Sequence, residues 1–269
     1  MKKIAILTVI LFMMTHIFSQ SKGSSDAMQL KRGSSENSGV KLSEIDKAIE
    51  TNPSDFQAYY NRGILKSELN DFEGAIKDFS KSINLNPNFS SAYFNRANCK
   101  VDLGNYIDAI NDYTKSIEIN KNESDSYFNR GYAKYQINQI SDAIKDYDLG
   151  LKYNSQCFMG YYTRGVLKSI DENYHEAILD FTRAIEINKE FDGAYFNRGI
   201  AKINLERFKD AILDFNKTIS ISPTHKLAFF NRGIAKINTN DKDGACLDFS
   251  RAKELGSTEG GEFYNKYCK

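Results

Sequence analysis

The chain contains no tryptophan and has only three proline and three histidine residues among its 269. One histidine, His16, lies in an N-terminal segment that we expect to be removed, which leaves His175 and His225. A histidine-rich metal site or a histidine-dependent catalytic triad is therefore not expected. The chain also has no large excess of charge of either sign, since it contains 36 basic and 35 acidic residues. This balance predicts neither nucleic acid nor an anionic membrane as a partner.

The N-terminal apolar stretch is too short to span a membrane. It runs from Ile4 to Met14 after two lysines, whereas a membrane-spanning helix needs about 20 apolar residues. A short basic start, a short apolar run and a small residue, Ser19, are typical of a secretory signal. We expect cleavage after Ser19 and a secreted or periplasmic protein without stable membrane insertion; a retained anchor is the alternative. No cysteine precedes Cys99, which excludes a lipid-modified cysteine at the new N-terminus.

One short string recurs along the chain. Ala-Tyr-Tyr-Asn-Arg-Gly at residues 58–63 has related copies that start at residues 92, 126, 160, 194 and 228, each 34 residues after the last. A strict period of this length is the signature of a solenoid built from supersecondary units. The six copies occupy residues 56–89, 90–123, 124–157, 158–191, 192–225 and 226–259. Positions in each repeat are numbered 1–34, so that Phe56 is position 1 of the first.

Each repeat contains two helical patterns separated by a turn near positions 15 and 16. Positions 4, 8 and 11 share one face of the first helix, and positions 17, 20, 21, 24 and 28 form an apolar face on the second. All three prolines, Pro53, Pro87 and Pro223, fall at position 32 or its equivalent before the first repeat. Proline there ends the preceding helix and marks the boundary between repeats.

Small and aromatic residues recur at fixed positions. Position 20 is Ala in all six repeats, position 8 is Gly or Ala, and position 24 is Phe or Tyr. With these residues the chain resembles the tetratricopeptide repeat family. The resemblance implies an all-α fold, a right-handed superhelical solenoid of antiparallel helix pairs with a concave groove, made of six full 34-residue units plus terminal half-units.

The remaining segments fit this organisation. Residues 1–19 are the expected signal peptide, and residues 20–40, with six Ser and three Gly, are an expected flexible leader. Residues 41–55 resemble a lone second helix and residues 260–269 a lone first helix. Such half-units act as caps, because the end faces of a solenoid are otherwise exposed and apolar.

Charged residues also repeat, and they depart from the family's usual pattern. Position 7 is Arg and position 11 is Lys in all six repeats, one turn apart, while position 23 is always Asp and position 19 is acidic in four. In an antiparallel pair that turns near position 15, position 7 lies level with position 23, and position 11 with position 19. We expect Arg130 to pair strongly with Asp146 and Lys134 to pair more weakly with Asp142. Whether the partners lie in the same repeat stays open, and a polyanion-binding track of arginines is the less favoured alternative.

Asparagine dominates position 6, which the resemblance places on the concave surface together with positions 2, 5, 9, 12 and 13. An Asn amide can donate to and accept from one peptide unit, so a ladder of them could hold an extended polypeptide backbone. The alternative is that each Asn bonds the neighbouring repeat and stabilises the stack. The ladder, which Thr163 interrupts in the fourth repeat, consists of Asn61, Asn95, Asn129, Asn197 and Asn231.

Position 5 is aromatic throughout. Rings along a groove could stack on the side chains or sugars of a ligand, although core packing between repeats is at least as good an interpretation. An apolar strip is expected on the first helices of the last three repeats, with Ile200 and Ile234 as candidate contacts. The aromatic candidates are Tyr60, Phe94, Phe128, Tyr162, Phe196 and Phe230.

Catalytic and metal-binding motifs are missing from the sequence. It has no Cys-x-x-Cys, no His-Glu-x-x-His and no phosphate-binding loop, so we expect no enzyme activity, cofactor or metal. An oxidising compartment would allow Cys246 and Cys268 to form a disulfide, although we do not favour it. The leading hypothesis is a non-enzymatic scaffold, monomeric or weakly self-associating, that binds an extended polypeptide or a partner helix in its groove. Binding of glycan or cell wall through the aromatics, and a purely structural or self-assembling solenoid, are the alternatives.

Overall fold

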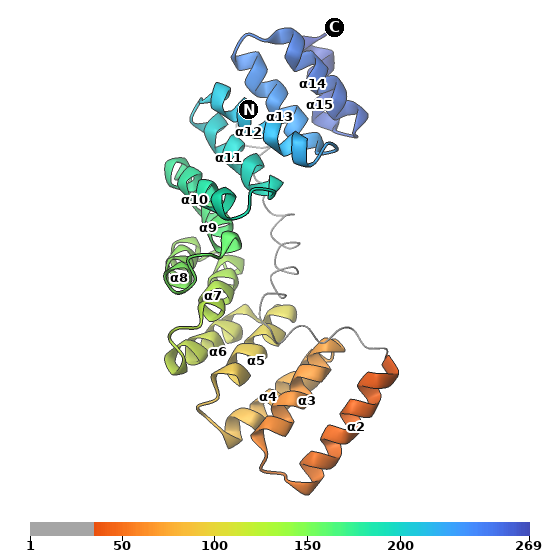
Figure 1. The fold of residues 1–269 in the computed structure, drawn as a ribbon, viewed down its shortest axis with the longest axis vertical. Helices are drawn as coiled ribbons and strands as arrows, with labels where there is room; N and C mark the ends of the chain where they lie inside the picture. The colour runs from red at the N-terminus through yellow and green to blue at the C-terminus, as the bar shows by residue number, and fades with distance from the viewer. Residues whose placement is uncertain (1–34) are drawn as a thin grey trace. The chain divides into compact units, whose positions relative to one another are not determined.

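A computed structural model describes residues 35–269 of the chain, and this part contains fourteen α-helices and no β-strand. The expected signal peptide, residues 1–19, lies outside the described residues. The helices fall into two compact units, one of which ends at Ser155 while the other begins at Gln156. Figure 1 labels the helices and colours them in chain order. None of the described helices is long and apolar enough to cross a membrane. The fold is an all-α repeat solenoid, as the sequence predicts.

The N-terminal unit, residues 35–155, carries the first three repeats. Within this unit each first helix packs against the second helix of its own repeat, and the second helices of the first two repeats pack against the first helix of the next repeat. Its helices are α2 (Ser35–Thr51), α3 (Phe56–Glu68), α4 (Phe72–Leu85), α5 (Ser90–Asp102), α6 (Tyr106–Ile119), α7 (Ser124–Gln136) and α8 (Ile140–Tyr153). Helix α2 begins inside the segment that we expected to be a flexible leader. The sequence did not predict this start, because residues 35–39 lack the apolar periodicity of an amphipathic helix.

The C-terminal unit, residues 156–269, is organised in the same way. Its helices are α9 (Phe158–Ile170), α10 (Tyr174–Ile187), α11 (Asp192–Asn204), α12 (Phe208–Ile221), α13 (Lys226–Asn238), α14 (Lys242–Glu254) and α15 (Thr258–Tyr267). Helix α15 packs against α14, and a disulfide between Cys246 and Cys268, with Cα atoms 5.6 Å apart, joins the two. The expectation against this bridge is therefore wrong.

The turn inside each repeat depends on one left-handed residue. Position 15 has a positive φ in all six repeats, between 58° and 77°, and is Asn in three of them, Glu in two and Gly in one. Asn and Gly tolerate this conformation better than other residues do, which explains their excess at the turn.

Close helix packing explains the small residues at positions 8 and 20. All six alanines at position 20 are completely buried. A Cβ atom added to Gly199 would lie 2.8 Å from Cε1 of Phe215, the ring at position 24 of the same repeat. The helices of a pair thus approach so closely that the aromatic ring occupies the space of a side chain at position 8.

Candidate functional site

The basic and acidic stripes meet within every repeat. In the third repeat, Nη2 of Arg130 lies 2.6 Å from Oδ1 of Asp146, and Nε lies 3.0 Å from Oδ2. This two-point contact confirms the predicted pairing of positions 7 and 23 and places both partners in one repeat. The same pair forms in the other five repeats as Arg62–Asp78, Arg96–Asp112, Arg164–Asp180, Arg198–Asp214 and Arg232–Asp248.

The lysine at position 11 binds the same aspartate, so the expected pair of Lys134 with Asp142 is wrong. Nζ of Lys134 lies 2.8 Å from Oδ2 of Asp146, while Asp142 pairs with Lys145 on its own helix at 2.9 Å. The side chain of Asp146 is only 3% exposed, and a buried carboxylate gains more from a second cation than an exposed one does. Lys168 also lies 3.6 Å from the carboxylate of Glu176 at position 19. Lys100, Lys202 and Lys236 instead donate to the backbone carbonyl oxygen at that position.

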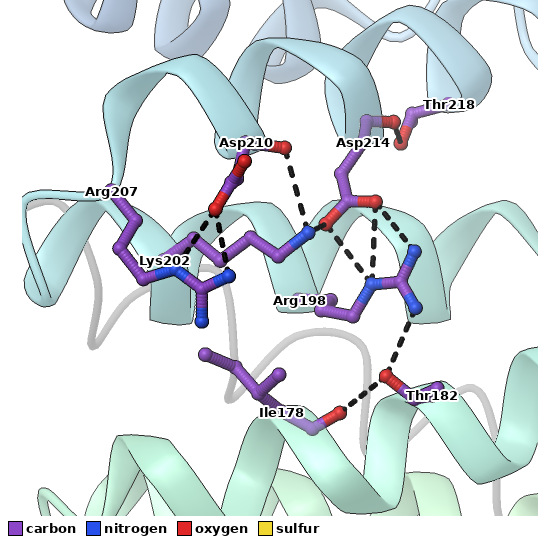
Figure 2. Close-up of polar contacts among 8 residues, drawn as sticks. All are labelled: Ile178, Thr182, Arg198, Lys202, Arg207, Asp210, Asp214 and Thr218. Atoms are coloured by element: carbon purple, nitrogen blue, oxygen red, sulfur yellow. Dashed lines mark hydrogen bonds and ion pairs between the residues drawn. The ribbon is translucent and has the colours of Figure 1, made fainter.

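The remaining arginine nitrogen reaches back to the preceding repeat. Nη1 of Arg198 donates to Oγ1 of Thr182, which in turn donates to the carbonyl oxygen of Ile178 (Figure 2). Arg96, Arg130 and Arg232 make the equivalent bond to Ser80, Thr114 and Asn216. All six arginines of position 7 pair with an aspartate and four of them also bond the preceding repeat, which argues against a polyanion-binding track.

The aromatic residues of position 5 lie in the core. Phe128, Tyr162, Phe196 and Phe230 are buried, and Tyr60 and Phe94 are half-buried. Each ring packs against the position 24 ring of its own repeat, with centroids 5.6 to 6.0 Å apart. Glycan stacking needs an open ring face, and packing covers the four buried rings.

The first-helix face, defined here as positions 2, 6, 9 and 13 of each repeat, carries the asparagines of position 6. In the N-terminal unit Asn61 is exposed, whereas Asn95 and Asn129 are half-buried. Asn95 donates to the hydroxyl of Tyr60 at 3.0 Å, and Asn129 donates to Oδ1 of Asn98 at 3.0 Å. Two of these three amides therefore bond the preceding repeat while remaining partly accessible.

In the C-terminal unit the two position 6 asparagines differ from each other. Asn197 is 8% exposed and donates to the hydroxyl of Tyr162 at 2.7 Å, which is the stack-stabilising role weighed above. Burial raises the pKa of this tyrosine, so its hydroxyl stays protonated. Asn231 is half-buried and donates to the carbonyl oxygen of Leu227 on its own helix.

Half-buried isoleucines follow the asparagines on α11 and α13. Ile200 and Ile203 pack against one core cluster, and Ile234 and Ile237 pack against the next. Each keeps part of its side chain exposed. In the fourth repeat, which the expected strip also included, Val166 at position 9 is buried instead.

Sequence reasoning missed the part that Asn98 plays. Asn98 stands at position 9, where the other repeats have Ile, Tyr or Val. This one amide was the sequence signal that could have predicted its hydrogen bond with Asn129. No group of three or more metal-ligating side chains occurs among residues 35–269.

The helix pairs and their stacking define a helical repeat solenoid. Models of the tetratricopeptide repeat match residues 56–89, 90–123, 160–191 and 192–225. The chain belongs to the tetratricopeptide repeat family. Comparison with curated protein sequences gives no match.

Solved structures share the fold at low sequence identity. YrrB, described as a tetratricopeptide repeat protein with an unusual peptide-binding site, is 24% identical, with a TM-score of 0.62 over 68% of this chain and 95% of its own. The C-terminal part of a repeat protein from Cytophaga hutchinsonii is 16% identical, with a TM-score of 0.73 over 84% and 94%. PilF from Pseudomonas aeruginosa is 14% identical, with a TM-score of 0.64 over 78% and 97%.

Proposed function

We propose that this protein is a non-enzymatic scaffold that binds an extended polypeptide segment along its first-helix face. The observation that carries the proposal is the contrast between two sets of polar groups. The charged side chains of positions 7, 11 and 23 form ion pairs with one another inside each helix pair. By contrast, Asn61, Asn95 and Asn129, all at position 6, keep accessible polar surface. Tetratricopeptide repeat proteins generally mediate protein–protein interaction, and YrrB is described as having a peptide-binding site.

Selection from a displayed library of random 12-residue peptides tests this proposal. A selected peptide should bind the purified wild-type protein and lose affinity when Asn61→Ala and Asn129→Ala are combined. The control is Asn111→Ala, which removes an exposed amide from the second helix α6. Failure to select any peptide, together with retention of the protein on a polysaccharide column, would favour the glycan hypothesis instead.

We also propose that the mature protein lies in an oxidising compartment, secreted or periplasmic, after cleavage behind Ser19. The disulfide between Cys246 and Cys268 supports this, because such bridges persist where thiols are not kept reduced. Cell fractionation and the intact mass of the native protein test it. A mass that includes residues 1–19, or a cytosolic protein, would contradict it.

A further inference from the structure

Three leucines at one repeat position are exposed to solvent in the C-terminal unit. Leu179 on α10, Leu213 on α12 and Leu247 on α14 stand at position 22, with exposed fractions of 61%, 66% and 73%. In the part of the chain that the structure describes, Ile107 is the one other large apolar residue that is more than half exposed. The three leucine side chains together are named the leucine row.

The fold does not require leucine at position 22. In the N-terminal unit the same position is polar and exposed in every repeat, as Lys77, Asn111 and Lys145. Core packing therefore does not explain the leucine row. A single exposed leucine is ordinary, but three at one position of consecutive repeats indicate a surface that another molecule covers.

The leucine row lies on one side of the C-terminal unit. The three repeats of this unit have the same helix pair and stack in the same way, with α10 on α11 and α12 on α13. Equal positions of the second helices therefore face the same side of the stack, apart from a small rotation per repeat. This side is built from second helices, so the inference does not depend on the peptide-binding role proposed for the first-helix face.

Charged residues flank the leucine row in a fixed order. On each of the three helices an acidic residue stands three or four positions before the leucine and a basic residue four positions after it, so all three share one helix face. Across the row the surface changes from acidic to apolar to basic. Lys209 adds a positive charge on the acidic side of α12, so the order is clearest on α10 and α14. The triplets are Glu176–Leu179–Arg183, Asp210–Leu213–Lys217 and Asp243–Leu247–Arg251.

The flanking charges also form ion pairs within the unit, and in each pair one or both side chains are largely exposed. Exposed ion pairs contribute little free energy, so these side chains can exchange partners when a complementary surface approaches. The pairs are Arg183–Glu186, Arg251–Glu254, Lys217–Glu190, Arg207–Asp210 and Lys168–Glu176.

We propose that the leucine row is the contact surface of a symmetric dimer, with a second copy of this chain as its occupant. A twofold axis parallel to the row places each leucine against its own counterpart and the acidic side of one copy on the basic side of the other. The facing helices run antiparallel, so Arg251 meets the partner's Asp243. A twofold axis across the row would oppose basic residues to basic residues, and the charge order disfavours it.

Self-complementarity distinguishes this occupant from others. An isologous interface needs one patch that fits itself, which the acidic–apolar–basic order provides. An anionic lipid surface would instead favour basic residues on both sides of the leucines.

Replacing the central leucine with the residue found in the other unit tests the contact. Leu213→Lys introduces the side chain that the first and third repeats have at position 22, so it is compatible with the fold. Sedimentation equilibrium of the purified protein from about 1 µM to 1 mM should show a monomer–dimer equilibrium, and Leu213→Lys should raise its Kd about tenfold or more. The control Asn111→Lys adds the same charge at position 22 of α6 and should leave the Kd unchanged.

Exchanging charges tests the orientation of the two copies. Arg251→Asp places like charges together and should weaken the dimer, whereas Arg251→Asp combined with Asp243→Arg restores opposite charges and should recover the wild-type Kd. With the twofold axis across the row, Arg251 would face a basic residue, and Arg251→Asp would strengthen the dimer instead. Circular dichroism checks that each variant is folded.

The outcomes decide between the occupants. A monomer at every concentration, or equal Kd values for Leu213→Lys and Asn111→Lys, would overturn the proposal. Binding of the monomer to vesicles of phosphatidylcholine and phosphatidylserine, abolished by Leu213→Lys, would assign the leucine row to lipid and overturn it as well. These results leave the proposed function standing, because its surface lies on the first helices.

Discussion

The guanidinium group of Arg198 is fixed against the carboxylate of Asp214, sixteen residues away on the partner helix of the same repeat (Figure 2). Nη2 lies 2.7 Å from Oδ1, and Nε lies 3.0 Å from Oδ2. Lys202 approaches the same carboxylate at 2.7 Å, and the Asp214 side chain is only 4% exposed. One buried anion is thus balanced by two cations, an arrangement that recurs in all six repeats.

Removing such an anion should destabilise the protein strongly. In Asp146→Ala, Arg130 and Lys134 lose their shared partner, and breaking a buried pair costs about 3–5 kcal/mol. Asp142→Ala removes an exposed carboxylate that pairs only along its own helix, so the free energy of unfolding should barely change. Urea unfolding of both variants measures the difference. Equal and small effects would show that solvent screens the buried cluster as well.

The hydrogen bond from Arg198 to Thr182 of the preceding repeat should make its own contribution to the free energy of unfolding. Thr182→Val keeps the shape of the side chain but removes the acceptor for Nη1 of Arg198. Loss of a hydrogen bond to a charged group predicts about 1.5–3 kcal/mol of destabilisation, measured by urea unfolding. Thr224→Val, at an exposed position of the same unit, is the control and should be neutral. An unchanged midpoint in Thr182→Val would mean that water replaces the threonine.

The disulfide should stabilise the last helix. A bridge that closes a loop with a sequence separation of 22 is worth about 3 kcal/mol in the chain-entropy model. In Cys268→Ser, we expect faster amide hydrogen exchange in α15 and a lower melting temperature. Cys157→Ser keeps the bridge and should behave like the wild type. The prediction is contradicted if reductant leaves exchange in α15 unchanged.

The stability of the C-terminal unit should fall at mildly acidic pH because of His225. Nδ1 of this residue accepts from the backbone N–H of Ala228 at the start of α13. Burial lowers the pKa of His225 below its ordinary value of 6.5, although the nearby Asp192 carboxylate opposes the shift. The unfolded chain therefore takes up the proton first, and the stabilisation present above pH 6.5 is lost as the pH falls below that value.

A variant that keeps the N-cap of α13 but has no titratable side chain isolates the contribution of His225 to the pH dependence of stability. His225→Asn retains a side-chain acceptor, so the wild type should lose more stability than the variant between pH 7.5 and pH 5.5. Urea midpoints at the two pH values give the comparison, and shared carboxylates cancel in the difference. Parallel pH profiles for the two proteins would rule out His225 as the source.

Local sequence signals were enough to predict the architecture. The 34-residue period, the small residues at positions 8 and 20 and the turn at position 15 are local signals repeated six times, and the structure contains the helices and turns that they predict. The register of the antiparallel pair was also sufficient to match Arg130 with Asp146, because both side chains lie level on facing helices.

The partners of the remaining polar atoms depend on the folded arrangement of the helices. Register could not show that Lys134 extends to the buried Asp146 instead of the exposed Asp142, since the choice depends on burial. It also could not show that the amide of Asn95 donates to the hydroxyl of Tyr60, while the amide of Asn98 accepts from the hydroxyl of Tyr113. Hydrogen bonds are directional, so which lone pair or proton is left for a ligand depends on neighbours that only folding brings together.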